Sequence, residues 1–235
     1  VGCMFGRYSL DAPGLILANQ GETLANYLAK VPQPTFEPDE DNVIPVLDGD
    51  WFPDDITERF RLFLRTTFGE ALFRENLKYI EDSLGKDIRK YFTKDFYSDH
   101  VKRYKKRPIY WLFSSGKQKS FQCLVYLHRY NEGTLSRIRS EYVIPLQGKM
   151  AARLEKLLGD IQAATSTAQS KRLEKERATL EKQQVELLAF DEKLRHYADM
   201  RISLDLDDGV KVNYGNFGDL LAQAKAVHGK KVEGI

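Results

Sequence analysis

The stretch Leu173-Glu-Lys-Glu-Arg-Ala-Thr-Leu180-Glu-Lys-Gln-Gln-Val-Glu-Leu187-Leu-Ala-Phe-Asp-Glu-Lys-Leu194 carries a leucine at every seventh position. This spacing places the leucines on one face of a helix. The positions that complete a coiled-coil seam include Glu176 and Gln183, so only half of the seam is apolar. The pattern runs from Ala151 to about Met200 and therefore favours a helical hairpin or a long spacer helix over a free coiled-coil dimer. Small and polar residues at 163–170 mark the expected hairpin turn.

Two aromatic and β-branched runs predict a β-hairpin in front of this helical stretch. They are Ile109-Tyr-Trp-Leu-Phe113 and Phe121-Gln-Cys-Leu-Val-Tyr-Leu127, on either side of the turn Ser114-Ser-Gly-Lys117. After the helical stretch, residues 202–206 alternate between apolar and polar before a turn at 207–209, which predicts a second hairpin ending near Val212. A last short helix is expected from about 217 to 227, and residues 229–235 are expected to be loose.

The region between residues 53 and 107 has the pattern of consecutive helices. Asp54 and Asp55 suit the positive end of a helix dipole, and Gly85 suits the end of the following helix. These patterns predict an α+β fold that is mostly α-helical, with small antiparallel β-hairpins and a long spacer helix or helical hairpin. We expect a mixed α/β body with a basic face at 1–147. Residues 148–235 should then contain the long helix or hairpin, the second β-hairpin and the short terminal helix.

Charge is segregated along the chain, although the 235 residues include 36 Lys and Arg against 34 Asp and Glu. Residues 31–58 contain nine acidic residues and no Lys or Arg, whereas residues 86–107 contain nine Lys and Arg against three Asp. Such segregation indicates distinct charged faces or a charge-selective partner. The longest apolar run, residues 123–127, is too short to span a membrane. Two cysteines and no leader indicate reduced thiols in a cytoplasmic protein, and an opening without Met indicates a piece of a longer chain.

The common catalytic and cofactor motifs are missing from the sequence. No two glycines have the spacing Gly-x-Gly, so there is no dinucleotide fingerprint. The segment Ser115-Gly-Lys-Gln118 lacks the first glycine and the last Ser or Thr of a Walker loop, which favours a solvated hairpin turn. The four histidines are far apart and show no metal-ligand spacing. We therefore predict no catalytic, cofactor-binding or metal-binding residue in this chain.

A stretch of basic and aromatic residues is the one chemical feature above background. Lys and Arg neutralise phosphates largely without regard to sequence, and tyrosines can stack on bases. The predicted nucleic-acid-binding residues are Arg89, Lys90, Lys94, Lys102, Arg103, Tyr104, Lys105, Lys106, Arg107, Lys117 and Lys119. The alternative is a solvated basic face that pairs with the acidic segment at 37–58.

Several longer segments of the sequence resemble one protein family. They are Val1-Gly-Cys-Met-Phe-Gly-Arg-Tyr-Ser-Leu-Asp11, Ile44-Pro-Val-Leu-Asp-Gly-Asp-Trp-Phe52, Arg107-Pro-Ile-Tyr-Trp-Leu-Phe-Ser-Ser-Gly-Lys117, Tyr126-Leu-His-Arg-Tyr130, Glu141-Tyr-Val-Ile-Pro145 and Asp207-Asp-Gly-Val-Lys-Val-Asn-Tyr-Gly215. Together they resemble the carboxyl-terminal part of the PglX family, the adenine-specific DNA methyltransferases of BREX phage-exclusion systems.

This resemblance implies a parent protein that transfers a methyl group from S-adenosylmethionine to N6 of adenine and marks host DNA as self. The family's catalytic tetrapeptide is of the Asn-Pro-Pro-Tyr type, but the eight prolines of this chain include no adjacent pair. The glycine motif that binds the cofactor is also missing. No catalytic or cofactor-binding residue is therefore carried over, and the pocket for the flipped adenine is expected elsewhere in the parent.

Two functions follow from the sequence as alternatives. The first is a non-catalytic domain that clamps and positions double-stranded DNA for the methyltransferase and recognition regions of the same parent chain. The second is a protein–protein interaction module for other phage-exclusion proteins, using the acidic loop and the half-apolar leucine row. Neither needs a membrane or a cofactor of its own.

Overall fold

The computed structural model describes residues 1–229 of the chain and divides into two compact units. Unit 1 comprises residues 1–113, 122–131 and the segment from Ser203 onward. Unit 2 comprises Ser114–Phe121 and Glu132–Ile202. These units do not follow the expected division at residue 147, because the chain leaves unit 1 twice and returns to it. The expectation for residues 230–235 lies outside the described residues.

Helices dominate both units, and 58% of the structure is helical. The helices of unit 1 are α1 (Leu24–Lys30), α2 (Ile56–Phe68), α3 (Glu70–Leu84), α4 (Ile88–Lys94), α5 (Phe96–Arg103), α9 (Val210–Gly215) and α10 (Ala224–His228), with 3-10 turns at Leu127–Arg129, Leu206–Asp208 and Gly218–Leu220. Those of unit 2 are α6 (Thr134–Arg137), a π-helical turn at Ile138–Val143, α7 (Ile144–Gln162) and α8 (Thr167–Asp199). The predicted mostly helical α+β class is confirmed.

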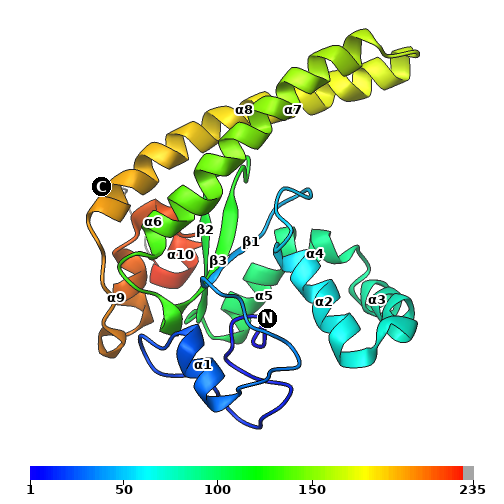
Figure 1. The fold of residues 1–235 in the computed structure, drawn as a ribbon. Helices are drawn as coiled ribbons and strands as arrows, with labels where there is room; N and C mark the ends of the chain where they lie inside the picture. Colours follow the sequence, from blue (N-terminus) through cyan, green and yellow to red (C-terminus); the bar gives the residue numbers. More distant parts are fainter. Residues whose placement is uncertain (230–235) are drawn as a thin grey trace. The chain divides into compact units, whose positions relative to one another are not determined.

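A three-stranded antiparallel sheet, in the order β1-β3-β2, lies in the middle of unit 1 (Figure 1). Its strands are β1 (Val43–Pro45), β2 (Tyr110–Ser114) and β3 (Gln122–Tyr126), which confirms the first predicted hairpin. In the register between β1 and β3, Ile44 lies opposite Leu124. All five residues of the central strand β3 are buried, which explains the unbroken apolar run that follows Gln122.

The outer edge of β2 is covered by the carboxyl-terminal segment of unit 1. The amide of Ala222 donates to the carbonyl oxygen of Leu112 at 2.8 Å, next to a bridge between Phe113 and Leu221. Trp111 is 1% exposed and packs edge-on against the ring of Tyr214, with centroids 5.2 Å apart. These contacts protect an edge that otherwise presents unpaired backbone groups.

The second hairpin, predicted at 202–212, was wrong. This segment forms the 3-10 turn Leu206–Asp208 and helix α9 instead. Asp205 caps the turn by accepting from the amide of Asp207 at 3.0 Å, and the amide group of Asn213 donates to the carbonyl oxygen of Gly209 at 3.0 Å. Helical spacing buries Asn213 and Tyr214 together, which alternation in a strand cannot do.

The predicted start and end signals of the helices between residues 53 and 107 are confirmed. Asp55 is the N-cap of α2, and its Oδ1 accepts from the amides of Thr57 and Glu58, each at 2.9 Å. Gly85 ends α3 in the left-handed conformation, with a φ of 65°.

Unit 2 is built around a hairpin of α7 and α8, which run side by side (Figure 1). The leucine repeat on α8 is buried as predicted, with exposures of 7%, 5%, 0% and 0% for Leu173, Leu180, Leu187 and Leu194. The turn falls between Gln162 and Thr167, inside the predicted range. Glu176, at a polar position of the seam, pairs with Arg153 of α7 at 2.6 Å. The leucines of the seam are therefore buried, and its polar position Glu176 is paired within the hairpin.

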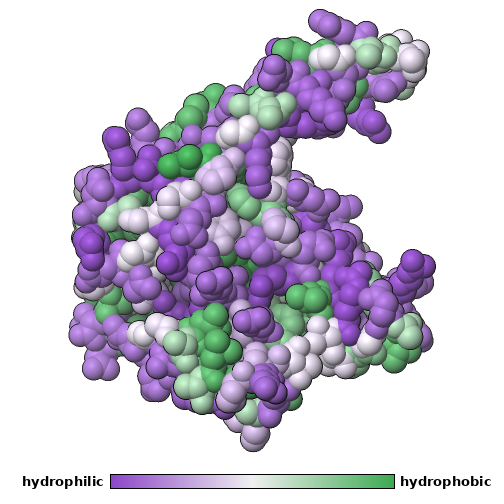
Figure 2. Space-filling model, in the orientation of Figure 1, coloured by the Kyte–Doolittle hydropathy of each residue, from purple (hydrophilic) through white to green (hydrophobic). Residues whose placement is uncertain are grey.

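The outward surface of this hairpin is mainly hydrophilic on the face seen in Figure 2, with scattered apolar side chains. Val185 and Leu188 of α8 are 71% and 52% exposed. Among the described residues, no helix is long and apolar enough to cross a membrane.

Candidate nucleic-acid interface

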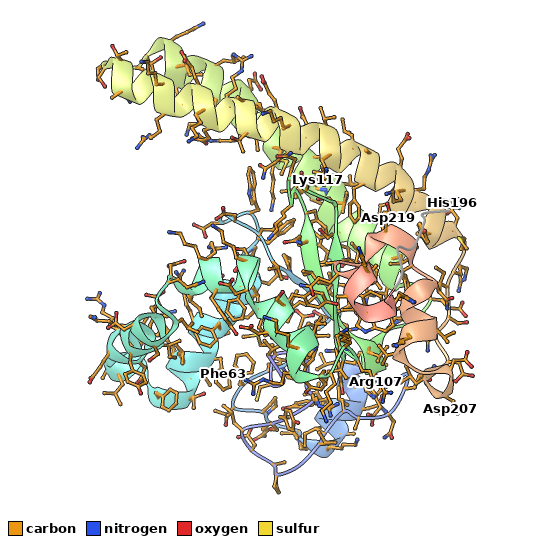
Figure 3. The ribbon with its side chains drawn as sticks, turned by 180° about the vertical axis from the view of Figure 1, so that it is seen from behind. Phe63, Arg107, Lys117, His196, Asp207 and Asp219 are labelled. Carbon is orange, nitrogen blue, oxygen red and sulfur yellow. The ribbon has the colours of Figure 1, made fainter. Side chains whose placement is uncertain are left out.

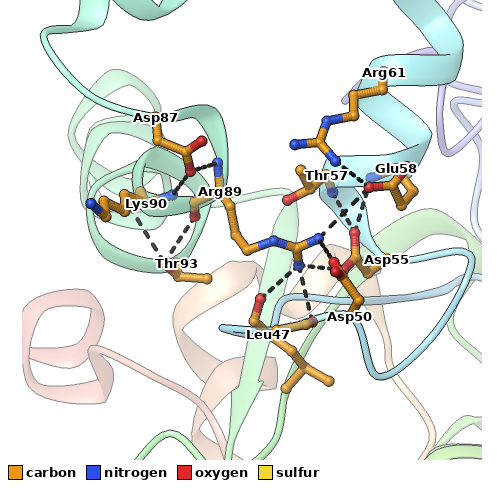
Figure 4. A network of polar contacts seen from close by, with 11 residues as sticks. Leu47, Asp50, Asp55, Thr57, Glu58, Arg61, Asp87, Arg89, Lys90 and Thr93 are labelled. Atoms are coloured by element: carbon orange, nitrogen blue, oxygen red, sulfur yellow. Dashed lines mark hydrogen bonds and ion pairs between the residues drawn. The ribbon is translucent and has the colours of Figure 1, made fainter. Parts of the chain in front are cut away.

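Arg89 is held inside unit 1 by a network of acidic and carbonyl groups (Figure 4). Its guanidinium pairs with Asp50 at 2.6 Å and with Asp55 at 2.5 Å, and it donates to the carbonyl oxygens of Leu47 and Gly49 at 3.0 and 3.1 Å. The Arg89 side chain is only 13% exposed. We therefore remove Arg89 from the predicted interface, because these contacts use its donors and neutralise its charge.

The alternative prediction, that basic residues pair with the acidic segment at 37–58, applies to this arginine. Asp50 and Asp55 both belong to that segment, and Glu58 lies 3.8 Å from the same guanidinium. Asp55 is 1% exposed, so an uncompensated charge at this position would be costly. The pairing explains why an arginine is needed at position 89, and it leaves the other predicted cations to be considered separately.

The remaining predicted cations fall into three groups. Lys90 and Lys94 are exposed on α4. Five cations are exposed at the end of α5 and in the turn after it: Lys102, Arg103, Lys105, Lys106 and Arg107. Lys117 and Lys119 lie in the turn between β2 and β3 and belong to unit 2, whereas the other two groups belong to unit 1. Figure 3 labels Lys117 of the third group and Arg107 of the second.

We call residues 102–107 the basic turn. It holds five cations in six positions, and all five side chains are exposed. Within the described part of the chain, none of the five lies within 4.0 Å of a carboxylate oxygen. Lys102 and Arg103 also sit at the carboxyl end of α5, where a positive charge complements the helix dipole. The basic turn therefore offers concentrated positive charge to solvent.

The backbone of the basic turn adopts a conformation that lysine rarely takes. Lys105 and Lys106 have φ angles of 51° and 64°, in the left-handed region that favours glycine. The amide of Lys106 donates to the carbonyl oxygen of Val101 at 2.8 Å, and that of Lys105 donates to Lys102 at 3.0 Å. This pair of bonds is a Schellman motif that closes α5. These amides are thereby used internally, so an anion must be bound by the side chains.

His100 is buried beneath the surface and packs against Tyr104 of the basic turn. Its Nε2 accepts from the amides of Ile109 and Tyr110, both at 3.2 Å, so this nitrogen is unprotonated. Burial lowers the pKa of His100 to about 4, which keeps the ring neutral. The predicted site residue Tyr104 is half-buried and packs on this ring, with centroids 4.6 Å apart. Tyr104 is thus held by packing against His100, and its part in nucleic-acid binding stays a prediction.

A surface pocket of about 590 Å³ opens beside the basic turn. Residues from α4 and α5 line it: Tyr91, Phe96, Asp99, His100, Lys102 and Arg103. It combines aromatic rings, a carboxylate and two cations within unit 1. Of these residues, the predicted set contains only Lys102 and Arg103. Phe96 and Asp99 were not predicted, although both follow the first basic cluster directly in the sequence.

The turn that carries Lys117 and Lys119 is held by Glu186, a residue that the sequence analysis did not single out. The Glu186 carboxylate accepts from the hydroxyl groups of Ser115 and Ser120 at 2.7 and 3.0 Å, and from the amide of Gln118 at 2.7 Å. Burial acts to raise the pKa of Glu186, but these hydrogen bonds outweigh burial and lower it. The turn is therefore fastened to α8 rather than simply solvated.

Gly116 gives the segment Ser115-Gly-Lys-Gln118 its partial similarity to a phosphate-binding loop, and its glycine has a structural cause. Its φ is +138°, and a Cβ atom there would lie 2.9 Å from an oxygen of Glu186. Glycine is needed because the carboxylate approaches the backbone closely. The Ser115-Gly-Lys segment therefore has a structural role within unit 2.

The described residues do not form the cofactor site of doubly wound α/β folds. That site lies at the carboxyl ends of parallel strands beside a glycine-rich turn, but this sheet is antiparallel and no Gly-x-Gly segment follows a strand. We derive no methyl-transfer step from this chain. Within residues 1–229, no group of three or more His, Cys, Asp or Glu side chains is arranged to hold a metal ion.

The chain is similar to two known adenine-specific methyltransferases, although no protein-family model matches it. It is 50% identical over 249 aligned positions to the adenine-specific methyltransferase BrxX of Escherichia coli O9:H4 (strain HS), covering all of this chain and 21% of that protein. It is 43% identical over 224 positions to the adenine-specific methyltransferase PglX of Lacticaseibacillus casei (strain Zhang), covering 91% of this chain and 18% of that protein. The resemblance of the quoted segments to the PglX family is thereby confirmed. The chain spans about a fifth of the length of these relatives.

Proposed function

We propose that this chain is a non-catalytic, DNA-binding part of an adenine-specific DNA methyltransferase. The parent would transfer a methyl group from S-adenosylmethionine to N6 of adenine, using residues outside this chain. The names of the two relatives support the parent activity.

One observation carries the DNA-binding proposal: the basic turn has five exposed cations, and none of them forms an ion pair with residues 1–229. Neutralising backbone phosphates releases counterions from the duplex, and this effect is largely independent of base sequence. Such contacts fix the register of a protein on DNA, while base contacts specify the site. The basic turn would therefore position the duplex, and reading of the methylation site would fall to other regions of the parent.

The proposal is tested by fluorescence anisotropy of the 235-residue chain with a labelled duplex at several salt concentrations. If about five phosphates are neutralised, the logarithm of the binding constant should fall with the logarithm of salt concentration with a slope of about −4.5. Replacing Lys102, Arg103, Lys105, Lys106 and Arg107 by alanine should reduce that slope to near zero.

A matched control separates the basic turn from net charge. Replacing Lys156, Lys171, Arg172, Lys175 and Lys182 of unit 2 by alanine also removes five exposed cations, and both variants change the formal net charge from +2 to −3 (31 Lys and Arg against 34 Asp and Glu). We expect the control to keep most of the slope. Equal slopes for the two variants, or no binding by the unaltered chain at low salt, would refute the proposal.

A second candidate function, docking onto protein, is favoured by exposed apolar side chains on α2 and α3. Leu62, Phe68, Leu72 and Tyr79 are 51%, 50%, 49% and 74% exposed. The partner would be the remaining region of the parent chain, or another protein of the phage-exclusion system. Light scattering of the chain mixed with the separately purified remainder of the parent tests this. A complex that Leu72→Ser and Tyr79→Ser weaken supports docking, and a mixture that stays unassociated refutes it.

A further inference from the structure

The pocket beside the basic turn has one aromatic side. The rings of Tyr91 and Phe96 meet edge to face, with centroids 6.3 Å apart, and Phe96 lies parallel to His100 at 6.0 Å. Tyr91 and Phe96 are each only partly buried, so ring surface faces the pocket. Partly exposed aromatic rings are the surfaces on which unpaired bases stack.

Charged side chains also line the pocket. Lys102 and Arg103 line it without an ion-pair partner in the described part of the chain. Asp99 is exposed, and its carboxylate accepts a long hydrogen bond of 3.4 Å from the hydroxyl of Tyr91. The pocket thus contains phosphate-binding groups and a hydrogen-bond acceptor next to a stacking surface.

We propose that this pocket binds one unstacked nucleotide of a DNA strand. The base would stack on Tyr91 and Phe96, its phosphate would lie against Lys102 and Arg103, and Asp99 would accept from an exocyclic amino group of the base. A volume of about 590 Å³ is within the usual range for small-ligand pockets. This inference rests on the proposed DNA-binding function and adds to it, because paired bases inside a duplex cannot reach these rings.

The chemistry of Asp99 sets a base preference. A carboxylate accepts from the N4 amino group of cytosine, whereas thymine presents a carbonyl oxygen at the same position. The unaltered chain should therefore bind an oligocytidylate strand more tightly than an oligothymidylate strand of the same length. Asp99→Ala should bring the ratio of the two affinities close to one, and binding of thymidylate should not weaken, because a negative charge is removed.

The experiment measures anisotropy of the full chain with three labelled probes of about twelve nucleotides: oligo(dC), oligo(dT) and a duplex. Tyr91→Leu removes the ring and should weaken oligo(dC) binding about tenfold, while duplex binding changes less than about twofold. Tyr91→Phe is the matched control, because it keeps the ring and should retain the affinity for oligo(dC) within about twofold. Thermal unfolding of each variant verifies that it is folded.

The outcomes distinguish this inference from the proposed function. Absence of binding to all three probes would refute both. Duplex binding with no selective loss of oligo(dC) binding in Tyr91→Leu would overturn the nucleotide pocket alone. An equal preference for oligo(dC) in Asp99→Ala and in the unaltered chain would overturn the role of Asp99.

Discussion

Replacing Lys105 by glycine should make the protein more stable and weaken its binding to DNA. Lys105 follows the C-cap of α5 and has a φ of 51°, while its amide and that of Lys106 complete the Schellman motif. Glycine adopts this conformation without a steric penalty. The hydrogen bonds of the motif involve only backbone atoms, so Lys105→Gly leaves them in place.

The magnitude follows from two opposing effects. Holding an L-residue in the left-handed region costs about 1–2 kcal/mol, and glycine removes this cost. Glycine also raises the conformational entropy of the unfolded chain, which offsets about 0.5–1 kcal/mol of the gain. The free energy of unfolding should therefore rise by about 0.5–1 kcal/mol. Loss of one phosphate contact should make the salt slope of DNA binding less steep by about 0.9.

Urea denaturation followed by circular dichroism measures the stability, and duplex anisotropy measures the binding. Lys102→Gly is the matched control, because it removes the same charge from a right-handed position inside α5 and should destabilise the protein by about 0.5–1 kcal/mol. The two variants should lose DNA affinity alike while their stabilities change in opposite directions. A destabilised Lys105→Gly variant would refute the conformational argument, and an unchanged salt slope would refute the phosphate contact.

Three further predictions concern contacts within unit 1 or within unit 2. Gly116→Ala should lower the free energy of unfolding by about 1–3 kcal/mol, because its Cβ would lie 2.9 Å from a Glu186 oxygen, and an unchanged urea midpoint would contradict this. Arg89→Met should cost about 3–5 kcal/mol by leaving the buried Asp55 carboxylate unpaired, yet should not alter the salt slope of DNA binding; a flatter slope would return Arg89 to the interface. Burial lowers the pKa of His100 from 6.5 to about 4, so its contribution to stability is complete above pH 6.5 and should fall by up to about 3 kcal/mol as the pH drops towards 4. Urea midpoints across this range should show that decline, and a His100→Phe variant with the same decline would contradict the assignment.

Periodic patterns in the sequence were sufficient to predict the elements that have a single buried face. The leucine repeat of α8 predicted the helical hairpin because all four leucines are buried on one face of a helix that packs along α7, α6 and the π-helical turn. The same reasoning failed at 202–212. Alternation over three apolar residues also arises in an irregular segment, and the burial of Tyr214 against Trp111 depends on a strand about a hundred residues earlier in the sequence.

The sequence identified the basic stretch but could not separate its members. In the sequence, Arg89 and Lys102 are both cations of the basic stretch. In the structure, Arg89 pairs with Asp55 and Asp50, which lie 34 and 39 positions earlier, whereas Lys102 is exposed. Glu186 holds a turn 68 positions away, and no local pattern indicates such a contact. The left-handed conformation of Lys105 was also unpredictable, because glycine is the residue that normally indicates it.

The most direct test of the central claim locates the DNA on the protein. Lysine side chains of the full chain can be acetylated briefly with and without a saturating duplex at low salt, and each site quantified by mass spectrometry. We predict that Lys102, Lys105 and Lys106 are protected severalfold by the duplex, while Lys171 and Lys175 of unit 2 react at unchanged rates. Equal reactivity of the basic turn with and without DNA, or protection confined to unit 2, would contradict the claim that residues 102–107 bind the phosphate backbone.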